Sequence, residues 1–403
     1  MCTRKSNLNA SRRSMRLLAS IATVSALLAS VAHATECDPK EKTTGVTKTE
    51  IKLGSLMPLS GSAAAGGIGA RDGAQAYFDI INDAGGIQGR KIKYTVLDDQ
   101  YTPSVAQQQI RTLIQREGVF AIAGGEGTPN FLATVPFIER SGVPAIAPYA
   151  PSSELGTMKA PHVFMTAVNY ITEFQIMTDY VVKNFKPKSL GLVGVQGNVG
   201  DDAKAGMDAA VKGTDVKVNY IPEVPGTADL TPIATQLRDA NADWVFLILT
   251  NADTGQLLES MARIGYKPQT AAWAGMDDEN YIKGFGHLSQ GMIIAEETAK
   301  LDSSDPLVKK FVADFKAKTG RDPGKFEELG WSQAQITVKA LQDSKALTRS
   351  CLMASLESMK NFETGILPPI SFGPELRQGV NAVGLVKLEG DKTKEVMPFT
   401  SVK

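Results

Sequence analysis

Short loops rich in Gly, Ser and Thr are the segments of this sequence with the chemistry to bind a small organic ligand. Three of them follow apolar runs in the first half of the chain, at residues 58–62, 124–129 and 148–153. Backbone N–H groups at the start of a helix can hold a carboxylate, and glycine lets a ligand approach the backbone closely. The loops could also be simple turns and caps, but three at equivalent strand ends favour a shared site. The ligand-binding candidates in them are Ser60, Glu126, Thr128, Tyr149 and Ala150.

The second half of the chain has loops of the same kind, at residues 196–201, 250–253 and 275–278. In the last of them, Asp277 could receive a cationic or hydrogen-bond-donating group of a ligand. A solvated helix cap is an equally good interpretation of this aspartate. The ligand-binding candidates from this half are Tyr170, Asn198, Val199, Thr250 and Asp277.

Signals for catalysis are weak. The sequence contains no Walker A loop, no HExxH and no GxSxG, and Gly67, Gly69 and Gly73 miss the GxGxxG spacing by one position. His162 and His287 have the context of surface residues, and the carboxylates are scattered without an evident acid/base pair. We therefore expect a protein that is not an enzyme and that has no cofactor and no metal site.

The elements that must position these loops alternate between strand and helix from residue 50 onward. Apolar runs such as 51–56 and 92–97 predict strands, and residues 74–84 between them have helical spacing. The same strand, loop, helix and glycine pattern occurs at 119–149 and again at 244–275. The prediction is an α/β fold of two similar lobes, each a parallel sheet with helices on both faces.

The end of the chain predicts helices at 307–318, 326–344 and 348–359, followed by strands at 370–373 and 383–388. No low-complexity linker separates the two lobes. The chain is therefore expected to cross between them more than once.

Residues 1–34 have the pattern of a cleaved signal peptide. Basic residues precede an apolar stretch at 17–32, and Ala32-His33-Ala34 places cleavage before Thr35. A membrane anchor is the alternative, but the stretch is short and contains four hydroxyl residues. Lipidation at Cys37 is disfavoured because Glu36 stands where a small residue is needed. We expect a periplasmic protein.

Charge and cysteines limit the function further. Five of the 43 basic residues and none of the 43 acidic ones lie in 1–34, so the mature chain would carry a net charge of −5. This mild acidity argues against binding nucleic acid. Cys37 and Cys351 are the only cysteines of the mature chain, and in an oxidising compartment they could form a disulfide or stay as two free thiols.

Several segments resemble the branched-chain amino-acid type of periplasmic solute-binding proteins of ABC transporters. The resemblance runs from about Val46 to the C-terminus, and its most specific part is the IND-x-GGI-x-G segment at 81–89. The opening at 51–61, Leu97-Asp98-Asp99 and Pro368 to Gly373 also match. The resemblance implies a type I periplasmic binding protein, with two Rossmann-like lobes joined by a three-stranded hinge. Lobe 1 would take 48–168 plus 297–378, and lobe 2 would take 169–296 plus 379–403.

The resemblance also implies roles for pocket residues. Thr128 would bind a ligand carboxylate, the Tyr149 carbonyl would receive an α-ammonium group, and Asp277 would pair with that ammonium. Pro151 replaces a threonine of the family, which weakens the amino-acid interpretation. Gly66, Val199 and Thr250 replace aromatic residues, so a larger pocket is expected, part of which Tyr149 and Tyr170 could refill.

These observations lead to one main functional hypothesis. We expect a solute-binding protein, a monomer, that captures a small organic ligand between its lobes and passes it to membrane permease subunits of an ABC importer. A hydrophobic or aromatic carboxylate is the preferred ligand, and an amide or a larger amino acid is the second choice. The alternative function is a ligand-sensing subunit of a regulatory or receptor complex on the same fold.

Overall fold

Strands β1 to β5 form a parallel sheet with the order β2-β1-β3-β4-β5 in the computed structural model, which describes residues 34–401. The proposed signal peptide therefore lies outside the described residues except for Ala34. Apolar runs between Gly-rich turns form these strands, as expected. Their bounds are β1 (Glu50–Met57), β2 (Lys91–Asp98), β3 (Ala121–Ala123), β4 (Ala145–Ile146) and β5 (Val163–Phe164).

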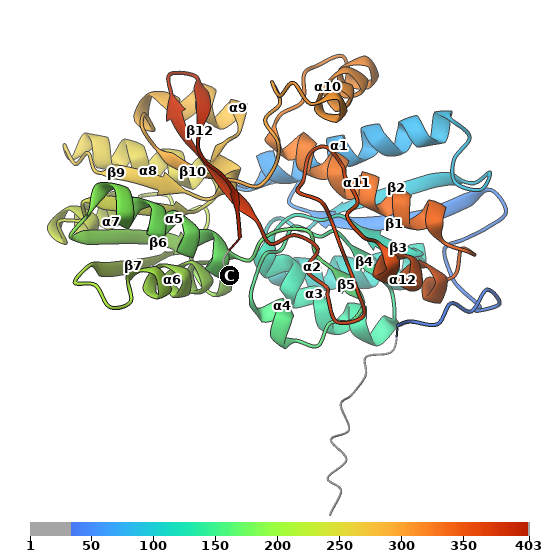
Figure 1. Ribbon diagram of the computed structural model, residues 1–403. Coiled ribbons are helices and arrows are strands. Elements are labelled where there is room, and N and C mark those ends of the chain that lie inside the picture. The colour runs from blue at the N-terminus through green and yellow to red at the C-terminus, as the bar shows by residue number, and fades with distance from the viewer. Residues whose placement is uncertain (1–33, 402–403) are drawn as a thin grey trace, which may run out of the picture. The chain divides into compact units, whose positions relative to one another are not determined.

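Helices cover both faces of this sheet. Leu53, Ala121 and Ala123 belong to one apolar core and Leu56 and Ile122 to another, because successive side chains of a strand point to opposite faces. In Figure 1, α1 and α11 lie on one side of β1 and β2, and α2 and α3 lie on the other. The helices are α1 (Ala64–Asp83), α2 (Pro103–Arg111) with a π-helical turn (Thr112–Glu117), α3 (Thr128–Ser141), α4 (Glu154–Thr157), α10 (Pro306–Thr319), α11 (Lys325–Asp343) and α12 (Arg349–Ser358).

Two glycines allow α1 and α11 to pack with their backbones almost in contact. A Cβ at Gly73 would lie 2.0 Å from the carbonyl oxygen of Glu327, and one at Gly330 would lie 1.8 Å from that of Ala70. Only glycine fits such a close approach. The packing joins segments more than 250 residues apart in the sequence and brings the start of α11 to the ligand side of the first sheet.

The second sheet has the order β12-β11-β10-β9-β8-β6-β7. The strands from β7 to β10 are parallel, and the central strand β8 is buried along its whole length. Its strands are β6 (Ser189–Val195), β7 (Lys217–Glu223), β8 (Trp244–Ile248), β9 (Gln269–Ala272), β10 (Ile293–Glu296), β11 (Val383–Glu389) and β12 (Lys392–Thr400). Its helices are α5 (Tyr170–Phe185), α6 (Asn198–Val211), α7 (Thr231–Asp239), α8 (Asn251–Arg263) and α9 (Glu279–Phe285).

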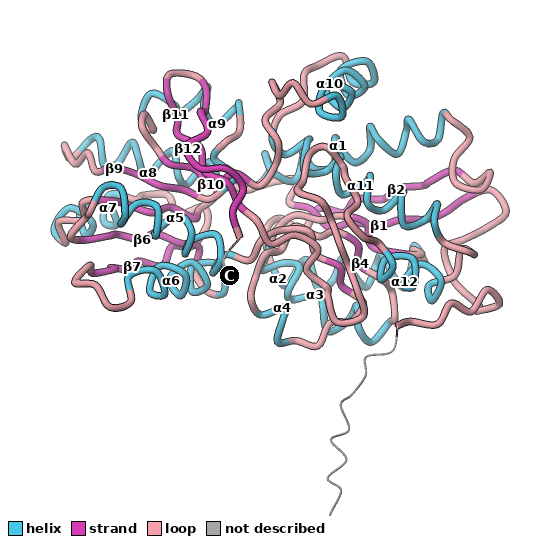
Figure 2. The backbone as a smooth tube through the Cα atoms, in the orientation of Figure 1, coloured by secondary structure: helices cyan, strands magenta, loops and turns pink. Residues whose placement is uncertain are grey.

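The chain passes three times between the two sheets, which confirms the predicted two-lobed fold. The passages follow β5, β10 and α12, and Figure 2 draws them mostly as loop. The first and third pair with each other, since Met165 N donates to the Arg377 carbonyl (2.8 Å) and Gly379 N to the Met165 carbonyl (2.7 Å). We propose the same lobe limits for the structure as for the sequence.

Two details of the C-terminal part differ from the sequence prediction. Residues 370–373 form no strand and make only an isolated bridge between Ile370 and Phe362. Strands β11 and β12 extend the second sheet in antiparallel orientation, so this sheet is not wholly parallel. The hairpin can join here because the third passage returns the chain beside β10.

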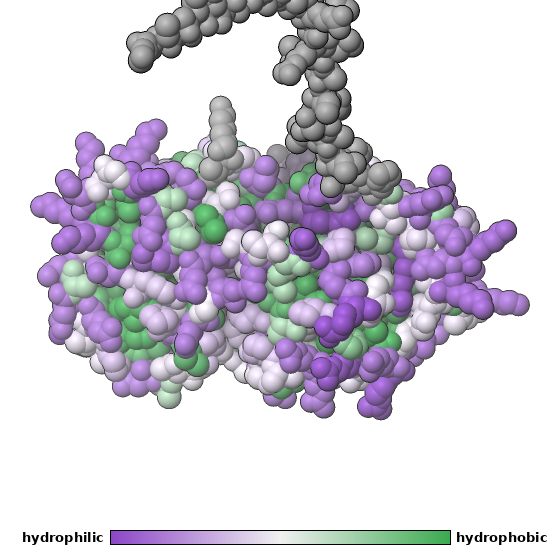
Figure 3. Space-filling view, turned by 90° about the horizontal axis from the view of Figure 1, so that it is seen from below, coloured by the Kyte–Doolittle hydropathy of each residue, from purple (hydrophilic) through white to green (hydrophobic). Residues whose placement is uncertain are grey.

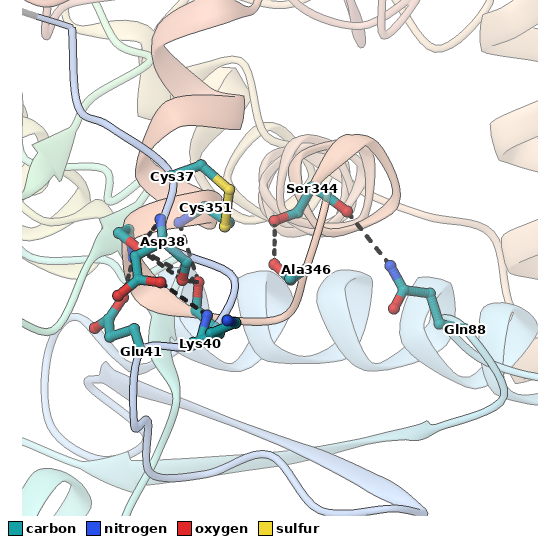
Figure 4. Close-up of a disulfide and its surroundings, with 10 residues drawn as sticks. Cys37, Asp38, Lys40, Glu41, Gln88, Ser344, Ala346 and Cys351 are labelled. Atoms are coloured by element: carbon teal, nitrogen blue, oxygen red, sulfur yellow. Dashed lines mark hydrogen bonds between the residues drawn. A yellow bond between two sulfur atoms is a disulfide. The ribbon is translucent and has the colours of Figure 1, made fainter.

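The segment before β1 is attached to α12 by a disulfide between Cys37 and Cys351, drawn in Figure 4. Among the helices of residues 34–401, none is long and apolar enough to cross a membrane. On the face shown in Figure 3, polar residues predominate and apolar residues form separate groups between them.

Candidate ligand-binding site

A pocket lies between the loops of the two lobes, where the carboxyl ends of the parallel strands point. It contains about 490 Å³ of space free of protein atoms, part of which is open to solvent. Parallel sheets place ligand sites at this edge because each strand leads there into the N-terminus of a helix. The first or second residue of six helices lines the pocket: Ala65 of α1, Thr128 of α3, Tyr170 of α5, Val199 of α6, Asn251 of α8 and Phe326 of α11.

Glu126 is the acidic residue of the pocket lining. The lining within residues 34–401 contains no Lys, Arg or His. Glu126 is 9% exposed, and its Oε2 has no hydrogen-bond partner among the described residues. Burial raises the pKa of Glu126 to about 8, and the nearby Asp99 carboxylate contributes in the same direction. Glu126 is therefore mostly protonated at neutral pH and can donate a hydrogen bond into the pocket.

Hydroxyl and amide groups form the rest of the polar lining. Thr128 Oγ1 and the Tyr170 hydroxyl are 3.1 Å apart and share a hydrogen bond from opposite lobes. Thr128 is the first residue of α3 rather than its cap, because Gly127 takes the cap position with a φ of 114°. Thr250 caps α8 by accepting a hydrogen bond from Asp253 N (3.2 Å). Asn251, the next residue, also lines the pocket.

The apolar wall comes from both lobes and from α11. Trp273 is fixed by a hydrogen bond from its Nε1 to the Leu249 carbonyl (2.8 Å). The Phe326 ring lies 3.2 Å from where a Gly66 Cβ would be, so it fills part of the room left by that glycine. The remaining apolar contacts come from Ala63 and Ala65 of the first lobe and from Val195, Val199, Ile248 and Leu249 of the second. Such a wall suits a ligand with an aliphatic or aromatic part.

The structure brings together five of the ten residues expected at the site: Glu126, Thr128, Tyr170, Val199 and Thr250 all line the pocket. Ser60 is exposed outside it and donates to Asp98 Oδ2 (2.7 Å). Asn198 is also exposed, and its side-chain amide donates to Glu154. Ala150 is fully buried in the core of the first lobe.

Tyr149 is buried beside the pocket but does not line it. Its hydroxyl donates to Glu297 Oε2 (2.7 Å), and its ring centroid lies 6.2 Å from that of Trp273. Burial raises the pKa of Glu297 to about 7 against the opposing hydrogen bond from Tyr149. The contact with Glu297, at the second passage between the lobes, holds Tyr149 away from the ligand space. Tyr149 therefore does not refill the pocket as expected.

Asp277 also lies elsewhere. Its Oδ1 accepts a hydrogen bond from Thr393 Oγ1 (2.7 Å), and it lines a separate cavity with Lys300 and Lys325. The hairpin strand β12 brings Thr393 to this position, and the sequence prediction did not include that strand. Asp277, the expected partner of an α-ammonium group, therefore lies outside the lining of the pocket.

Tyr101 and Phe326 are pocket residues that the sequence reasoning missed. Tyr101 follows the end of β2, so the rule that ligands bind at strand ends could have found it. Its backbone is left-handed (φ 51°) and is held by a hydrogen bond from Tyr101 N to Asp99 Oδ1 (2.9 Å). Phe326 carries no local signal, because it reaches the pocket only through the packing of α11 against α1.

The comparison with known families agrees with this geometry. The sequence model described as periplasmic binding protein matches residues 50–394. The chain belongs to this family. This confirms the resemblance drawn from the sequence, and it places the chain among proteins that bind solutes outside the cytoplasm.

Named relatives and solved structures are similar over most of their length. A Leu/Ile/Val-binding protein homolog of Brucella melitensis is 27% identical over 270 residues, covering 67% of this chain and 73% of the relative. A fatty acid ABC transporter substrate-binding protein from Thermomonospora curvata has a TM-score of 0.81 and 22% identity, over 90% of this chain and 95% of that one. A branched-chain amino acid transporter substrate-binding protein from Streptococcus pneumoniae, solved with isoleucine, has a TM-score of 0.76 and 21% identity, over 87% and 100%.

A pair of hydrogen bonds between α6 and the residue before α4 joins the two lobes of this periplasmic binding protein. Asp202 on α6 accepts from Ser153 N (2.7 Å) and from Ser153 Oγ (2.6 Å) at the start of α4. The side-chain amide of Asn198 donates to Glu154 beside them. Because Asp202 is only 8% exposed, these bonds are shielded from water and favour the conformation in which the lobes touch.

We expect Asp202→Ala to weaken ligand binding about tenfold, equal to about 1.4 kcal/mol, because it removes contacts made only when the lobes touch. Calorimetry on the ligand identified below measures the change. Asp208→Ala is the matched control, since Asp208 is exposed on the same helix and pairs only with Lys204. Equal affinities of the two variants would contradict a role for Asp202 in lobe closure.

Proposed function

We propose that this protein captures a small hydrophobic or aromatic carboxylic acid outside the cytoplasmic membrane and delivers it to the permease of an ABC importer. The observation that carries the proposal is the pocket between the lobes, which combines six helix N-termini with a buried glutamic acid and an apolar wall. Export of the chain would follow cleavage after Ala34. The protein would act as a carrier and would perform no chemistry on its ligand.

Helix N-termini support an anionic ligand. Each N-terminus carries a partial positive charge and N–H groups without partners in the helix. Six of them contribute their first or second residue to one pocket whose described lining has no basic side chain that would pair with an anion. A carboxylate can therefore be bound by backbone N–H groups and by the hydroxyl groups of Thr128 and Tyr170.

Glu126 favours an acid over an amine. In its protonated form it donates a hydrogen bond to a ligand carboxylate, so it does not repel the anion. The α-ammonium site expected in the branched-chain amino-acid type is depleted, because Pro151 has no hydroxyl and Asp277 lies outside the pocket. The Brucella melitensis relative is named for amino acids, and the similar Thermomonospora curvata structure is named for a fatty acid. The choice between these classes therefore depends on the pocket chemistry.

Titration calorimetry on protein stripped of ligand by unfolding and refolding tests the proposal. The panel would contain phenylacetate, benzoate, hexanoate and octanoate as acids, phenylacetamide as a neutral analogue, and leucine and phenylalanine as amino acids. We expect the tightest binding for one of the acids. Binding of leucine tighter than that of every acid in the panel would overturn the ligand class.

Glu126 makes a prediction about pH. Affinity for the acid should be constant from pH 6 to 7.5 and should fall as pH rises through about 8, because ionised Glu126 repels the ligand carboxylate. The titratable groups that face it are the Asp99 carboxyl and the Tyr101 phenol, and burial raises the pKa of Tyr101, so this phenol stays neutral over this pH range. Glu126→Gln keeps a donor, so affinity at pH 7 should change less than about threefold while the pH dependence is lost.

The comparison of wild type with Glu126→Gln also distinguishes a ligand with an amine group from a carboxylic acid. An ammonium group would need ionised Glu126, so its affinity would rise with pH and would be largely lost in Glu126→Gln. Asp99→Asn is the control for the neighbouring carboxyl, whose pKa burial raises to about 7. A pH dependence that persists in Glu126→Gln would contradict the assigned role of Glu126.

A further inference from the structure

Glu357 is a buried carboxylate that accepts a hydrogen bond from the backbone nitrogen of Thr35. Thr35 N donates to Glu357 Oε2 at 2.6 Å, and Thr35 Oγ1 donates to Glu357 Oε1 at 2.8 Å. Arg377 also donates to Oε1, at 2.7 Å. The Glu357 side chain is 3% exposed, whereas Arg377 is 21% exposed. Thr35, the second residue of the described chain, is thus hydrogen-bonded to a buried carboxylate.

The sequence places a processing site at the same position. Ala32-His33-Ala34 has small residues at the two positions that a signal peptidase recognises, so cleavage falls between Ala34 and Thr35. Ala34 is exposed. Cleavage there would convert the Thr35 amide nitrogen into an α-ammonium group. The sequence motif and the hydrogen bond to Glu357 are independent observations that single out the same nitrogen atom.

We propose that the α-ammonium group of Thr35, released by cleavage after Ala34, forms an ion pair with Glu357 and docks the processed N-terminus onto α12. The proposal rests on the export included in the proposed function. In the cleavage step, water adds across the Ala34–Thr35 peptide bond, giving the Ala34 carboxylate and the protonated Thr35 amine.

The surroundings of Glu357 favour a positive charge in addition to that of Arg377. Burial alone would raise the pKa of Glu357, but the hydrogen bond from Thr35 N and the contact with Arg377 hold it below its usual value. Glu357 is therefore ionised at neutral pH. An amide donates one N–H without charge, whereas an ammonium group donates three and carries a full charge. Charge-assisted hydrogen bonds are about twice as strong as neutral ones.

The ion pair would connect the N-terminus to the hinge. The Arg377 guanidinium lies 4.4 Å from the Phe164 ring centroid, and its Nε donates to the Pro161 carbonyl at 2.7 Å. Arg377 also begins the third passage between the lobes, through its carbonyl contact with Met165. Cys37, two residues after Thr35, is bonded to Cys351 on the same helix as Glu357. The short segment is thus held at both ends.

The test compares two proteins that differ by one residue at the N-terminus. One begins with Thr35 and the other with Ala34, which moves the ammonium group one residue away from Glu357. We expect the melting temperature of the Ala34 protein to be lower by about 2–4 °C at pH 6.5. In a Glu357→Gln background, the two proteins should melt at the same temperature.

The pH dependence has a definite sign. An unperturbed α-amino group has a pKa of about 7.7–8.0, and pairing with Glu357 raises it in the folded state. The extra stability is therefore fully present below about pH 7.7 and is lost as pH rises through the raised value. We expect the difference between the two proteins to disappear by about pH 10.5.

Three results would overturn the proposal: equal melting temperatures with Glu357 intact, a difference that survives Glu357→Gln, or an exported protein whose first residue is not Thr35. N-terminal sequencing of the exported protein decides the last point. Ligand calorimetry reports separately on the proposed function. Failure of the ion pair and failure of the ligand assignment are thus distinguishable.

Discussion

Lys325→Met is expected to lower the free energy of unfolding by about 3–5 kcal/mol, because it removes one partner of a buried ion pair. Lys325 is 8% exposed at the start of α11, and its Nζ lies 2.6 Å from Glu296 Oε1 and 2.7 Å from Thr298 Oγ1. The Thr298 hydroxyl in turn donates to Glu328 Oε2 at 2.6 Å. Both glutamates are buried, so the variant would leave two carboxyl groups without their cation at the second passage between the lobes.

Urea unfolding at pH 8 and at pH 5 measures this effect. Burial raises the pKa of Glu296 to about 7 and that of Glu328 to about 8, with Lys325 opposing both shifts. Without Lys325 both pKa values should rise further. A carboxyl group with a raised folded-state pKa favours folding less as pH increases above its unfolded pKa. The difference between wild type and variant should therefore be larger at pH 8 than at pH 5.

Lys339→Met is the matched control, because Lys339 lies on the same helix in an exposed pair with Asp343. Its effect should stay within about 0.5 kcal/mol. Adding Glu296→Gln to Lys325→Met should restore part of the lost stability, since one unpaired charge is then removed. If Lys325→Met were as stable as the control, the ion pair would have no role in holding the hinge.

Removing the disulfide is expected to have the second large effect, a loss of about 2–5 kcal/mol for Cys37→Ser with Cys351→Ser. The bond closes a loop with a sequence separation of 314 residues, so it restricts the unfolded chain strongly. Cys351 is 2% exposed near the start of α12, where Thr348 Oγ1 accepts from Cys351 N (3.3 Å). Urea unfolding of the double variant measures the loss.

Reduction of the wild-type protein provides the control for the disulfide. Reduced wild type should unfold at the same urea concentration as the double serine variant, because both lack the same restraint on the unfolded chain. Reduction of the variant itself should have no effect. An unchanged midpoint on reduction of the wild type would contradict the expected stabilisation.

The sequence by itself determined the two-lobed α/β fold and indicated five of the residues that line the candidate pocket. Apolar runs and glycine stops mark the strands and helices because hydrophobic period and turn chemistry are local properties. The loops with Glu126 and Thr128 could be placed at the pocket because the ends of parallel strands meet at one edge. The strand β12 could not be predicted, since it is mostly exposed and owes its form to pairing with β11.

The tertiary structure alone decided where several side chains point. Phe326 reaches the pocket, and Lys325 reaches the hinge, only because glycines let α11 pack closely on α1. Tyr149 turns to Glu297, and Asp277 turns to Thr393, so both leave the ligand space. The partners of Tyr149 and Asp277 are more than 100 residues away in the sequence. Such contacts depend on how whole elements pack, and no local pattern of residues records that packing.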